Sequence, residues 1–225
     1  MRVIIGLGNP GREYERTRHN IGWMALDALA ERVQAGRFRR EKTVEVAEAR
    51  LGEEKAYLLK PQTYMNRSGQ ALSSWLEWFG EVRDAIREKA EPSDPVPGLP
   101  SPTREEKAEL AACVWPGLLV ITDDVNLDLG RMRFRPSGSA GGHNGLTDIQ
   151  KALGGNGYPR LRIGVGAPPE RMDRADYVLG RFAVAETPVA LKVAETAAGA
   201  VCDWAAGGMD AVRAKYNGML IGGAV

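Results

Sequence analysis

The chain has 225 residues, 44% of them hydrophobic, and a formal net charge of +1 at pH 7. It is long enough to bury a full core, and its charge excludes wholesale wrapping of nucleic acid, while local arginine clusters remain compatible with it. No apolar run reaches membrane-spanning length, and Cys113 and Cys202 cannot build a disulfide framework, so we expect a soluble, unexported protein of the reducing cytoplasm.

The first predicted elements are a strand and a helix joined by a glycine-rich loop. Residues 3–8 are an apolar run typical of a buried strand, and a helical stripe begins at Ile21. Between them, residues 6–11 read GLGNPG, which fits the GxGxxG pattern of dinucleotide-binding domains. In those domains the helix that holds the pyrophosphate starts at the loop, whereas here a polar run delays the helix. We therefore interpret the loop as a turn that carries Asn9 out of the strand end.

A hairpin and a second helix follow. Residues 44–51 and 55–59 have strand-like patterns on either side of Gly52, which predicts a β-hairpin. The loop at residues 61–69, PQTYMNRSG, leads into a helix, and Ser68 is the expected cap of that helix. The apolar face of the helix carries Leu72, Trp75, Leu76 and Phe79.

Residues 81–115 differ in character from the rest of the chain. The stretch is charged and poor in apolar residues, and it contains Pro92, Pro95, Pro97, Pro100 and Pro102. Within it, Thr103 and Glu106 form a capping-box pattern that predicts a short helix. We expect one domain over residues 1–225, with this stretch as an inserted surface excursion.

Two carboxylates end the next predicted strand. Residues 118–122 are a short apolar run, followed directly by Asp123 and Asp124. Central strands of α/β sheets deliver such side chains to the carboxyl edge of the sheet, where ligands bind. Because successive side chains of a strand point to opposite faces, we expect Asp123 and Asp124 to have different surroundings.

The segment at residues 131–135 alternates between arginine and apolar residues, which predicts a strand. Met132 and Phe134 would face the core, and the opposite face would carry Arg131, Arg133 and Arg135. Other basic residues that could join this face are Arg160, Arg162 and Lys151. Such a row could follow a phosphate backbone, and a solvated strand face is the alternative.

A second glycine-rich loop, at residues 137–144, ends in His143 and Asn144. The remaining predicted elements are a helix at 146–153, a strand at 161–166, helices at 187–206 and 209–216, and a frayed end at 217–225. The alternation of strands and helices indicates an α/β domain.

Four blocks of the chain, in this order and at this rough spacing, resemble the bacterial-type peptidyl-tRNA hydrolases. The blocks are GLGNPGREYERTRHNIGW, PQTYMNRSG, ITDD and GSAGGHNGL. The resemblance implies a single three-layer α/β globule, in which a twisted mixed sheet has helices on both faces. It also implies hydrolysis of the ester between a peptide and the terminal ribose of tRNA, without a metal or organic cofactor. We expect the protein to be a monomer. The tRNA would be held by its acceptor end and phosphate backbone.

Ester hydrolysis at neutral pH needs a base that takes a proton from water, and histidine, with an ordinary pKa of about 6.5, suits this task. His19 is the candidate base, and Asp123 aligns with the acid that orients the base in the resembled family. No GxSxG elbow is present and neither cysteine has a neighbouring histidine, so we expect direct attack by water. The two histidines, His19 and His143, lack a local ligand spacing, so we expect no metal site.

The resemblance also assigns the substrate contacts. It places Asn9 and Asn66 near the peptide and the scissile bond, and we count Asn9 among the catalytic residues because an amide can stabilise a developing oxyanion. Tyr14, Tyr64 and Asn66 align with positions that contact the tRNA end, where an aromatic ring can stack on a base. The other expected substrate-binding residues are Asn144, His143, Arg133, Arg135 and Arg162.

Two alternatives from other classes stay open. A non-catalytic RNA-binding relative of the same fold would bind structured RNA but release no peptide. A dinucleotide-binding oxidoreductase would bind NAD or FAD through residues 6–11. The presence of His19, Asp123 and Asn9 together favours the hydrolase.

Overall fold

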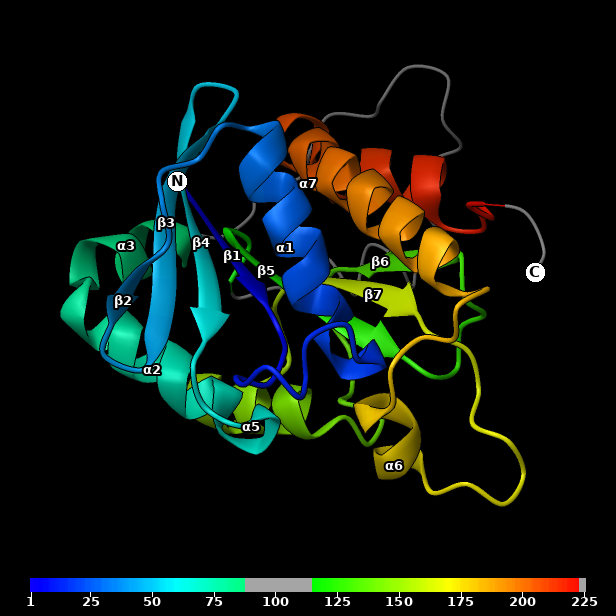
Figure 1. Cartoon of the computed structure of the whole chain (residues 1–225). Helices are drawn as coiled ribbons and strands as arrows, with labels where there is room; N and C mark the ends of the chain where they lie inside the picture. The colour runs from blue at the N-terminus through cyan, green and yellow to red at the C-terminus, as the bar shows by residue number, and fades with distance from the viewer. Residues whose placement is uncertain (88–114, 223–225) are drawn as a thin grey trace.

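The computed structural model describes residues 1–87 and 115–222, and this part of the chain forms one sheet with helices on both faces (Figure 1). The strands are β1 (Arg2–Gly6), β2 (Arg39–Glu41), β3 (Val44–Leu51), β4 (Glu54–Pro61), β5 (Leu118–Asp124), β6 (Met132–Arg135) and β7 (Arg160–Gly164). The helices are α1 (Ile21–Arg32), α2 (Ser68–Trp78), α3 (Gly80–Ile86), α5 (Asn144–Leu153), α6 (Arg174–Leu179) and α7 (Thr187–Tyr216). Short 3₁₀ turns, η1 (Arg18–Asn20) and η2 (Met65–Arg67), precede α1 and α2.

The strand order of the sheet is β2-β3-β4-β1-β5-β7-β6. The central strand β1 lies parallel to β4 and β5, and β5 lies parallel to β7. The strands β2, β3 and β6 pair antiparallel with their neighbours, so the sheet is mixed, as predicted. Because β1, β4, β5 and β7 run in the same direction, their carboxyl ends meet at one edge, which is where open α/β sheets bind ligands.

Two layers of helices enclose the sheet. Helices α1 and α7 cover one face, and α2 and α5 cover the other (Figure 1). Alternate residues of β1 supply the two cores: Ile4 packs into the α1 and α7 cluster, whereas Val3 and Ile5 pack into the α2 and α5 cluster. The three-layer α/β fold is therefore confirmed, and the near-continuous apolar runs of β1 and β5 follow from burial on both faces.

Two glycines let α1 lie directly on the sheet. A Cβ at Gly6 would come within 2.5 Å of the Gly22 carbonyl oxygen, and a Cβ at Gly22 would come within 2.6 Å of the carbonyl oxygens of Leu7 and Ile121. The first glycine of GLGNPG therefore serves close packing. Because α1 begins only at Ile21, the loop does not open a helix in the way that a pyrophosphate cradle requires.

Most of the predicted strands and helices are confirmed, but some local predictions are wrong. Ser68 is not a cap: it is the first residue of α2, and its Oγ donates to the Met65 carbonyl at 2.8 Å. Residues 217–222 are not frayed, because the Ile221 amide donates to the Gly130 carbonyl at 2.8 Å and the Ile221 side chain is buried. The short elements β2 and α6 gave no clear sequence pattern, since neither has two full periods of side chains.

The predicted insertion at residues 81–115 lies mostly outside the described residues, as does the helix predicted at Thr103. Residues 80–86 form α3, whose Val82 and Ile86 are buried. The boundaries of the domain and of the insertion stay predictions. In α7, Gly208 has φ 73° and divides the helix into the two segments predicted from the sequence.

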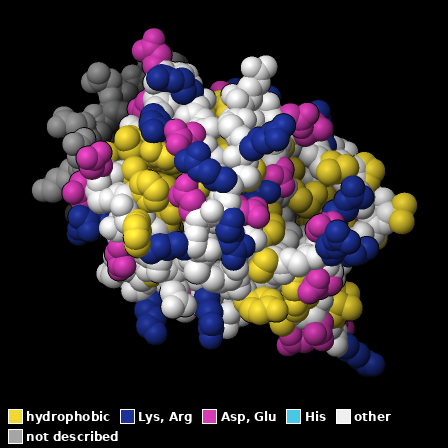
Figure 2. Space-filling view, turned by 60° about the vertical axis from the view of Figure 1, so that its left-hand side comes forward, with side chains coloured by type: hydrophobic (Ala, Val, Ile, Leu, Met, Phe, Trp, Pro, Cys, Tyr) yellow, Lys and Arg dark blue, Asp and Glu magenta, His cyan; other side chains and the backbone are white. Residues whose placement is uncertain are grey.

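The surface carries both signs of charge. On the face shown in Figure 2, lysine and arginine side chains intermingle with aspartate and glutamate, as expected from the net charge of +1. None of the described helices combines the length and apolarity that crossing a membrane requires. Because positive and negative side chains are mixed on this face, a basic surface for nucleic acid would have to be a local cluster of arginine and lysine.

Candidate active site

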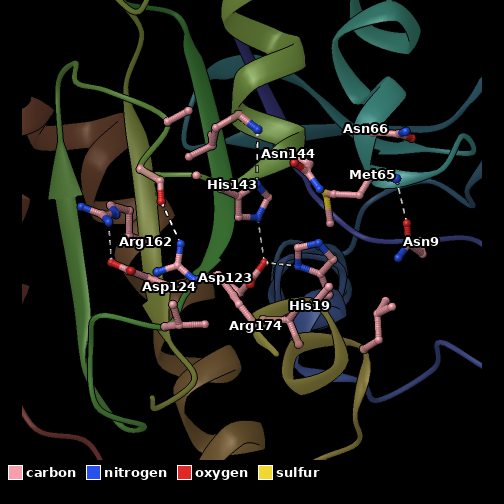
Figure 3. A pocket seen from close by; sticks show the side chains of 18 of the residues that line it. Asn9, His19, Met65, Asn66, Asp123, Asp124, His143, Asn144, Arg162 and Arg174 are labelled. Carbon is pink, nitrogen blue, oxygen red and sulfur yellow. Dashed lines mark hydrogen bonds and ion pairs between the residues drawn. The ribbon is translucent and has the colours of Figure 1, made fainter. Parts of the chain in front are cut away.

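A pocket of about 450 Å³ lies at the carboxyl edge of the parallel strands (Figure 3). Most of the residues singled out in the sequence line it: Asn9, Tyr14, His19, Tyr64, Asn66, Asp123, His143, Asn144 and Arg162. They come from the loop after β1, the turns η1 and η2, the end of β5, the start of α5 and strand β7. The pocket thus gathers side chains that are far apart in the sequence, as the strand-end position predicts.

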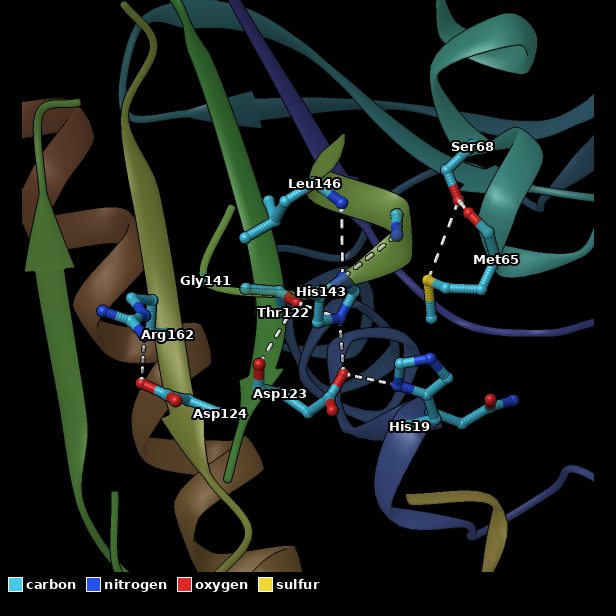
Figure 4. Close-up of polar contacts among 12 residues, drawn as sticks. His19, Met65, Ser68, Thr122, Asp123, Asp124, Gly141, His143, Leu146 and Arg162 are labelled. Carbon is cyan, nitrogen blue, oxygen red and sulfur yellow. Dashed lines mark hydrogen bonds and ion pairs between the residues drawn. The ribbon is translucent and has the colours of Figure 1, made fainter. Parts of the chain in front are cut away.

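His19 lies in η1, directly before α1, and only 8% of it is exposed. Its Nδ1 is 2.8 Å from Oδ1 of Asp123, which is the second-last residue of β5 (Figure 4). The predicted pairing of this histidine with this carboxylate is therefore present in the folded chain.

The turn that holds His19 is anchored from its other side by Arg18. The Arg18 guanidinium donates to the Arg181 carbonyl at 2.6 Å and to Oε2 of Glu186 at 2.7 Å, and it lies over the ring of Tyr177. Sequence analysis did not identify Arg18 as part of the site. These contacts connect η1 to the segment after α6, a helix that forms part of the pocket wall.

Asp123 accepts hydrogen bonds from two histidines. In addition to His19, Nε2 of His143 lies 2.9 Å from the same Oδ1 atom (Figure 4). Burial alone would raise the pKa of Asp123, but the two imidazole rings outweigh burial and hold this pKa well below the usual carboxyl range. Asp123 is therefore a carboxylate at neutral pH.

The contacts of His143 determine its tautomer. His143 is the N-cap of α5, and its Nδ1 accepts hydrogen bonds from the backbone amides of Gly145 at 3.1 Å and Leu146 at 3.2 Å. The proton of the neutral ring therefore lies on Nε2, which faces Asp123 and, at 2.7 Å, Oγ1 of Thr122. The sequence placed His143 among the expected substrate-binding residues, but it did not predict the contact with Asp123.

The same logic assigns the tautomer of His19. Because Asp123 is ionised and can only accept, Nδ1 of His19 carries a proton and donates it to Oδ1. Nε2 of the neutral His19 ring is then left as a proton acceptor. A histidine in this state has the protonation that a general base needs.

The side chain of Asn9 is also oriented by the fold. Its Oδ1 accepts a hydrogen bond from the backbone amide of Met65 at 2.7 Å (Figure 3). The other end of the amide, Nδ2, is therefore the end that can donate to a ligand. Asn9 is buried, so this donor would act where water is largely excluded.

Asp124 faces away from Asp123, as the strand alternation predicts. Its Oδ2 lies 2.8 Å from Nη2 of Arg162 (Figure 4). Its Oδ1 accepts from the backbone amide and the side chain of Asn126. Arg162 therefore lines the pocket as one member of an ion pair with Asp124. This pair reduces the net positive charge that Arg162 brings to the pocket.

The arginines of β6 extend outward from Arg162. Arg133 lies opposite Arg162 in the β6/β7 register, and Arg135 lies opposite Arg160. The expectation that Arg160 joins this face is wrong, because its side chain is buried and its guanidinium donates to the carbonyls of Ser139 and Asn156. Arg160 therefore holds the glycine-rich loop and the turn before β7.

Two tyrosines stand at one side of the pocket. The rings of Tyr14 and Tyr64 form an edge-to-face pair with centroids 6.4 Å apart, and 60% of Tyr64 is exposed. Asn66 lies in η2 beside them, and Asn144 is the first residue of α5. An exposed aromatic ring beside two amides suits the stacking and hydrogen bonding of an unpaired nucleotide base.

His19, Asp123 and His143 form a group that could hold a metal ion, because one ring nitrogen of each histidine and one carboxylate oxygen lie within 4.8 Å of one another. The expectation of no metal site rested on the distance between the histidines in the sequence, and the fold removes that argument. In the described structure, however, the facing atoms Nδ1 of His19 and Nε2 of His143 carry the protons donated to Asp123. A metal would have to displace both protons, and the absence of a metal stays a prediction.

Comparison with known proteins gives matches over nearly the whole chain. A family model described as peptidyl-tRNA hydrolase matches residues 3–86 and 108–221. Peptidyl-tRNA hydrolases of Rhodopirellula baltica and Chloroflexus aggregans are 38% and 41% identical to the chain over 221 and 218 residues, which is 96% of this chain and 97% and 99% of those proteins. The crystal structure of peptidyl-tRNA hydrolase from Acinetobacter baumannii matches with a TM-score of 0.73 and 26% identity, and the match covers 96% of each chain.

Proposed function

The chain belongs to the peptidyl-tRNA hydrolase family, and from this membership and the pocket geometry we propose how its residues carry out the reaction. The protein is a hydrolase that cleaves the ester between a peptide and the 3′-terminal ribose of tRNA, which frees the tRNA for reuse in translation. The observation that supports the residue assignment best is the His19 and Asp123 pair at 2.8 Å inside the pocket.

In the first step, Nε2 of His19 takes a proton from a water molecule while the water oxygen attacks the ester carbonyl carbon. Asp123 holds the imidazole in the required tautomer and stabilises the imidazolium that forms. General-base catalysis of this kind contributes roughly a hundredfold to ten-thousandfold to the rate. His19 is 8% exposed and lines the pocket, so a water molecule in the pocket can reach its ring.

The tetrahedral intermediate carries negative charge on the former carbonyl oxygen, and Nδ2 of Asn9 supplies a donor for it. A single preorganised donor of this type is worth about 3 kcal/mol in well-studied hydrolases. The intermediate then collapses: the bond between the acyl carbon and the ribose oxygen breaks, and the His19 imidazolium returns its proton to that oxygen. The products are a peptide carboxylic acid, which releases its proton to solvent at neutral pH, and a tRNA with a free terminal hydroxyl.

The tRNA is held by the residues around this centre. Tyr14 and Tyr64 offer rings for the terminal base, and Asn66 and Asn144, which also line the pocket, offer amides. His143 shapes the floor of the pocket through Asp123, and the basic row that begins at Arg162 continues along β6 for the phosphate backbone. The residues of that row are Arg133, Arg135 and Arg162.

We further propose that the protein acts as a monomer in the cytoplasm and needs no metal. The residues assigned to the chemistry and to the acceptor end all come from one chain, so a second copy is not needed to complete the pocket. The substrate class supports the location, because tRNA is used where translation takes place. Activity that survives dialysis against a chelator would support the metal-free reaction, and loss that added metal restores would contradict it.

The test of the function compares N-acetyl-aminoacyl-tRNA with the same tRNA carrying a free α-amino group. We expect rapid release of the N-acetyl-amino acid and little release of the unblocked one, measured by acid-precipitable label at neutral pH. A folded protein that binds the tRNA but leaves the ester intact would be a non-catalytic RNA-binding relative. Saturable NAD or FAD binding without deacylation would instead favour the oxidoreductase.

A further inference from the structure

We propose that Asn20 is a positioning residue that sets the place of the Asn9 donor relative to the base His19. The proposal rests on the function above, because it assigns Asn20 a task in that reaction. Asn20 follows His19 directly in η1, and only 3% of it is exposed. It does not line the pocket as far as the described residues define it, so any effect on the reaction is indirect, and the pocket residue that its side chain contacts is Asn9.

The side chain of Asn20 clamps the backbone of Asn9 with two hydrogen bonds. Its Oδ1 accepts from the Asn9 amide at 2.9 Å, and its Nδ2 donates to the Asn9 carbonyl at 3.0 Å. Asn9 lies beyond the end of β1, where the strand ladder no longer supplies partners for the backbone. A buried backbone group without a partner is costly, so the Asn20 amide takes the place of a neighbouring strand.

A third bond completes the placement of Asn9. Its Oδ1 accepts from the Met65 amide at 2.7 Å, so the backbone and one end of the side chain are held from two sides. Met65 comes from η2, on the chain segment after β4, whereas Asn20 comes from η1. The Nδ2 donor of Asn9 is therefore directed by two independent segments.

The consequence follows from the sequence neighbourhood of Asn20. Because one peptide bond joins His19 to Asn20, the turn that places the base also places the clamp on the oxyanion donor. The turn η1 therefore links the position of the base to the backbone that carries the donor, while the Met65 amide fixes the other end of the Asn9 side chain. Misplacing a reacting group by about 1 Å can cost about a hundredfold in rate, so this coupling has a measurable effect.

The chain contains a matched control. Asn217, at the end of α7, clamps the backbone of Phe134 in β6 in the same way: its Oδ1 accepts from the amide at 2.7 Å, and its Nδ2 donates to the carbonyl at 3.2 Å. This second clamp has the same chemistry but holds a core residue that takes no part in the ester chemistry. Removing it should cost stability without changing the geometry of the pocket. Because Phe134 lies between Arg133 and Arg135 of the proposed phosphate row, the control is read in the deacylation rate constant at saturation and not in binding.

The experiment is a double-mutant cycle on single-turnover deacylation of N-acetyl-aminoacyl-tRNA. We expect Asn20→Ala to lower the deacylation rate constant about 10- to 100-fold while changing KM less than about threefold. In the Asn9→Ala background, Asn20→Ala should cause almost no further loss, because its effect passes through Asn9. The deacylation rate constant of Asn217→Ala should stay within about twofold of the wild-type value, although its melting temperature should fall about as much as that of Asn20→Ala.

Several results would overturn the proposal. Losses that multiply in the Asn9→Ala background would mean that Asn20 does not act through Asn9, and an Asn217→Ala loss equal to that of Asn20→Ala would mean a general effect of stability. A shift in the acid limb of the pH profile of Asn20→Ala would mean that it acts through His19 and Asp123. If Asn20→Ala does not fold, Asn20→Asp, which has nearly the same size and keeps the Oδ1 acceptor but replaces the Nδ2 donor with a charged oxygen, takes its place in the cycle. Failure of the proposed function is distinguishable, since the wild type itself would then release no amino acid.

Discussion

The two halves of the pocket differ in how far their polar side chains are exposed to solvent. On the side assigned to the ester, Asn9, His19 and Asp123 are exposed by 5%, 8% and 4%, and each makes a hydrogen bond to another part of the fold. On the side assigned to tRNA, Tyr64 is 60% exposed and Arg162 keeps 27% of its side chain exposed. The polar groups of the first half are buried and joined to the fold by hydrogen bonds, whereas those of the second half are exposed to solvent.

The difference shows that one pocket follows two physical rules. A buried polar group must be paired, so the burial of Asn9, His19 and Asp123 forces them into one geometry. In a dry site an oriented dipole also acts at nearly full strength on a developing charge. Phosphates, by contrast, are bound through a field and through the release of counterions, for which hydrated, movable guanidinium groups are sufficient. Substitutions on the two sides should therefore affect different kinetic constants.

The largest effect is expected from His19→Ala. Removal of the proposed base should lower kcat by about 10²- to 10⁴-fold, while KM should change little because the tRNA contacts remain. Single-turnover deacylation together with tRNA binding by filter retention measures both quantities. A His19→Ala protein with near wild-type kcat and an unchanged melting temperature would remove His19 from the mechanism.

The next largest effect on kcat is expected from Asp123→Asn. An asparagine can donate its own N–H to Nδ1 of His19, which would leave the proton of the ring on Nε2, where water needs an acceptor. We expect a loss in kcat on the order of 10²- to 10³-fold with tRNA affinity retained. Equal kcat for Asp123→Asn and the wild type would show that the tautomer of His19 does not depend on this contact.

On the open side, the double change Arg133→Ala and Arg135→Ala should weaken binding without slowing the chemical step. Each lost phosphate contact should reduce the slope of log affinity against log salt by about 0.7 to 0.9, with kcat at saturation unchanged. The matched control is Arg39→Ala with Arg40→Ala on β2, which removes the same charge at the opposite edge of the sheet. Equal salt slopes for the two double variants would contradict a specific role for the β6 arginines.

The smallest effect concerns stability at low pH. Because the pKa of Asp123 is lowered on folding, its ionisation stabilises the folded state above the ordinary carboxyl pKa of about 4, and this contribution is lost as the pH falls toward the lowered value. The free energy of unfolding of the wild type, relative to Asp123→Asn, should therefore decrease between pH 5 and pH 2. Urea titrations at several pH values measure this difference. A difference that stays constant over this range would show that the carboxylate is not stabilised by folding.

Much of the fold could be predicted because hydrophobic periodicity is local. The apolar run at residues 118–122, the alternation of Met132 and Phe134 with arginines, and the break of the last helix near Gly208 are all visible within a few residues of sequence. The placement of Asp123 and Asp124 on opposite faces also follows from the two-residue period of a strand. The resemblance to a family added the candidate base and its acid.

Other features depended on contacts between distant segments. The sequence could not show that His143 meets Asp123, that Asn20 clamps Asn9 or that Arg160 is buried under the glycine-rich loop, because each contact joins elements whose relative position only packing determines. Ser68 shows the same limit at short range, since its hydroxyl found the Met65 carbonyl instead of capping the helix. The sequence alone therefore determined many of the polar groups that the pocket holds and the strand end that carries Asp123. Tertiary structure decided which nitrogen of each histidine carries the proton and which end of Asn9 is left for the substrate, because those choices are made by hydrogen-bond partners that fold in from elsewhere.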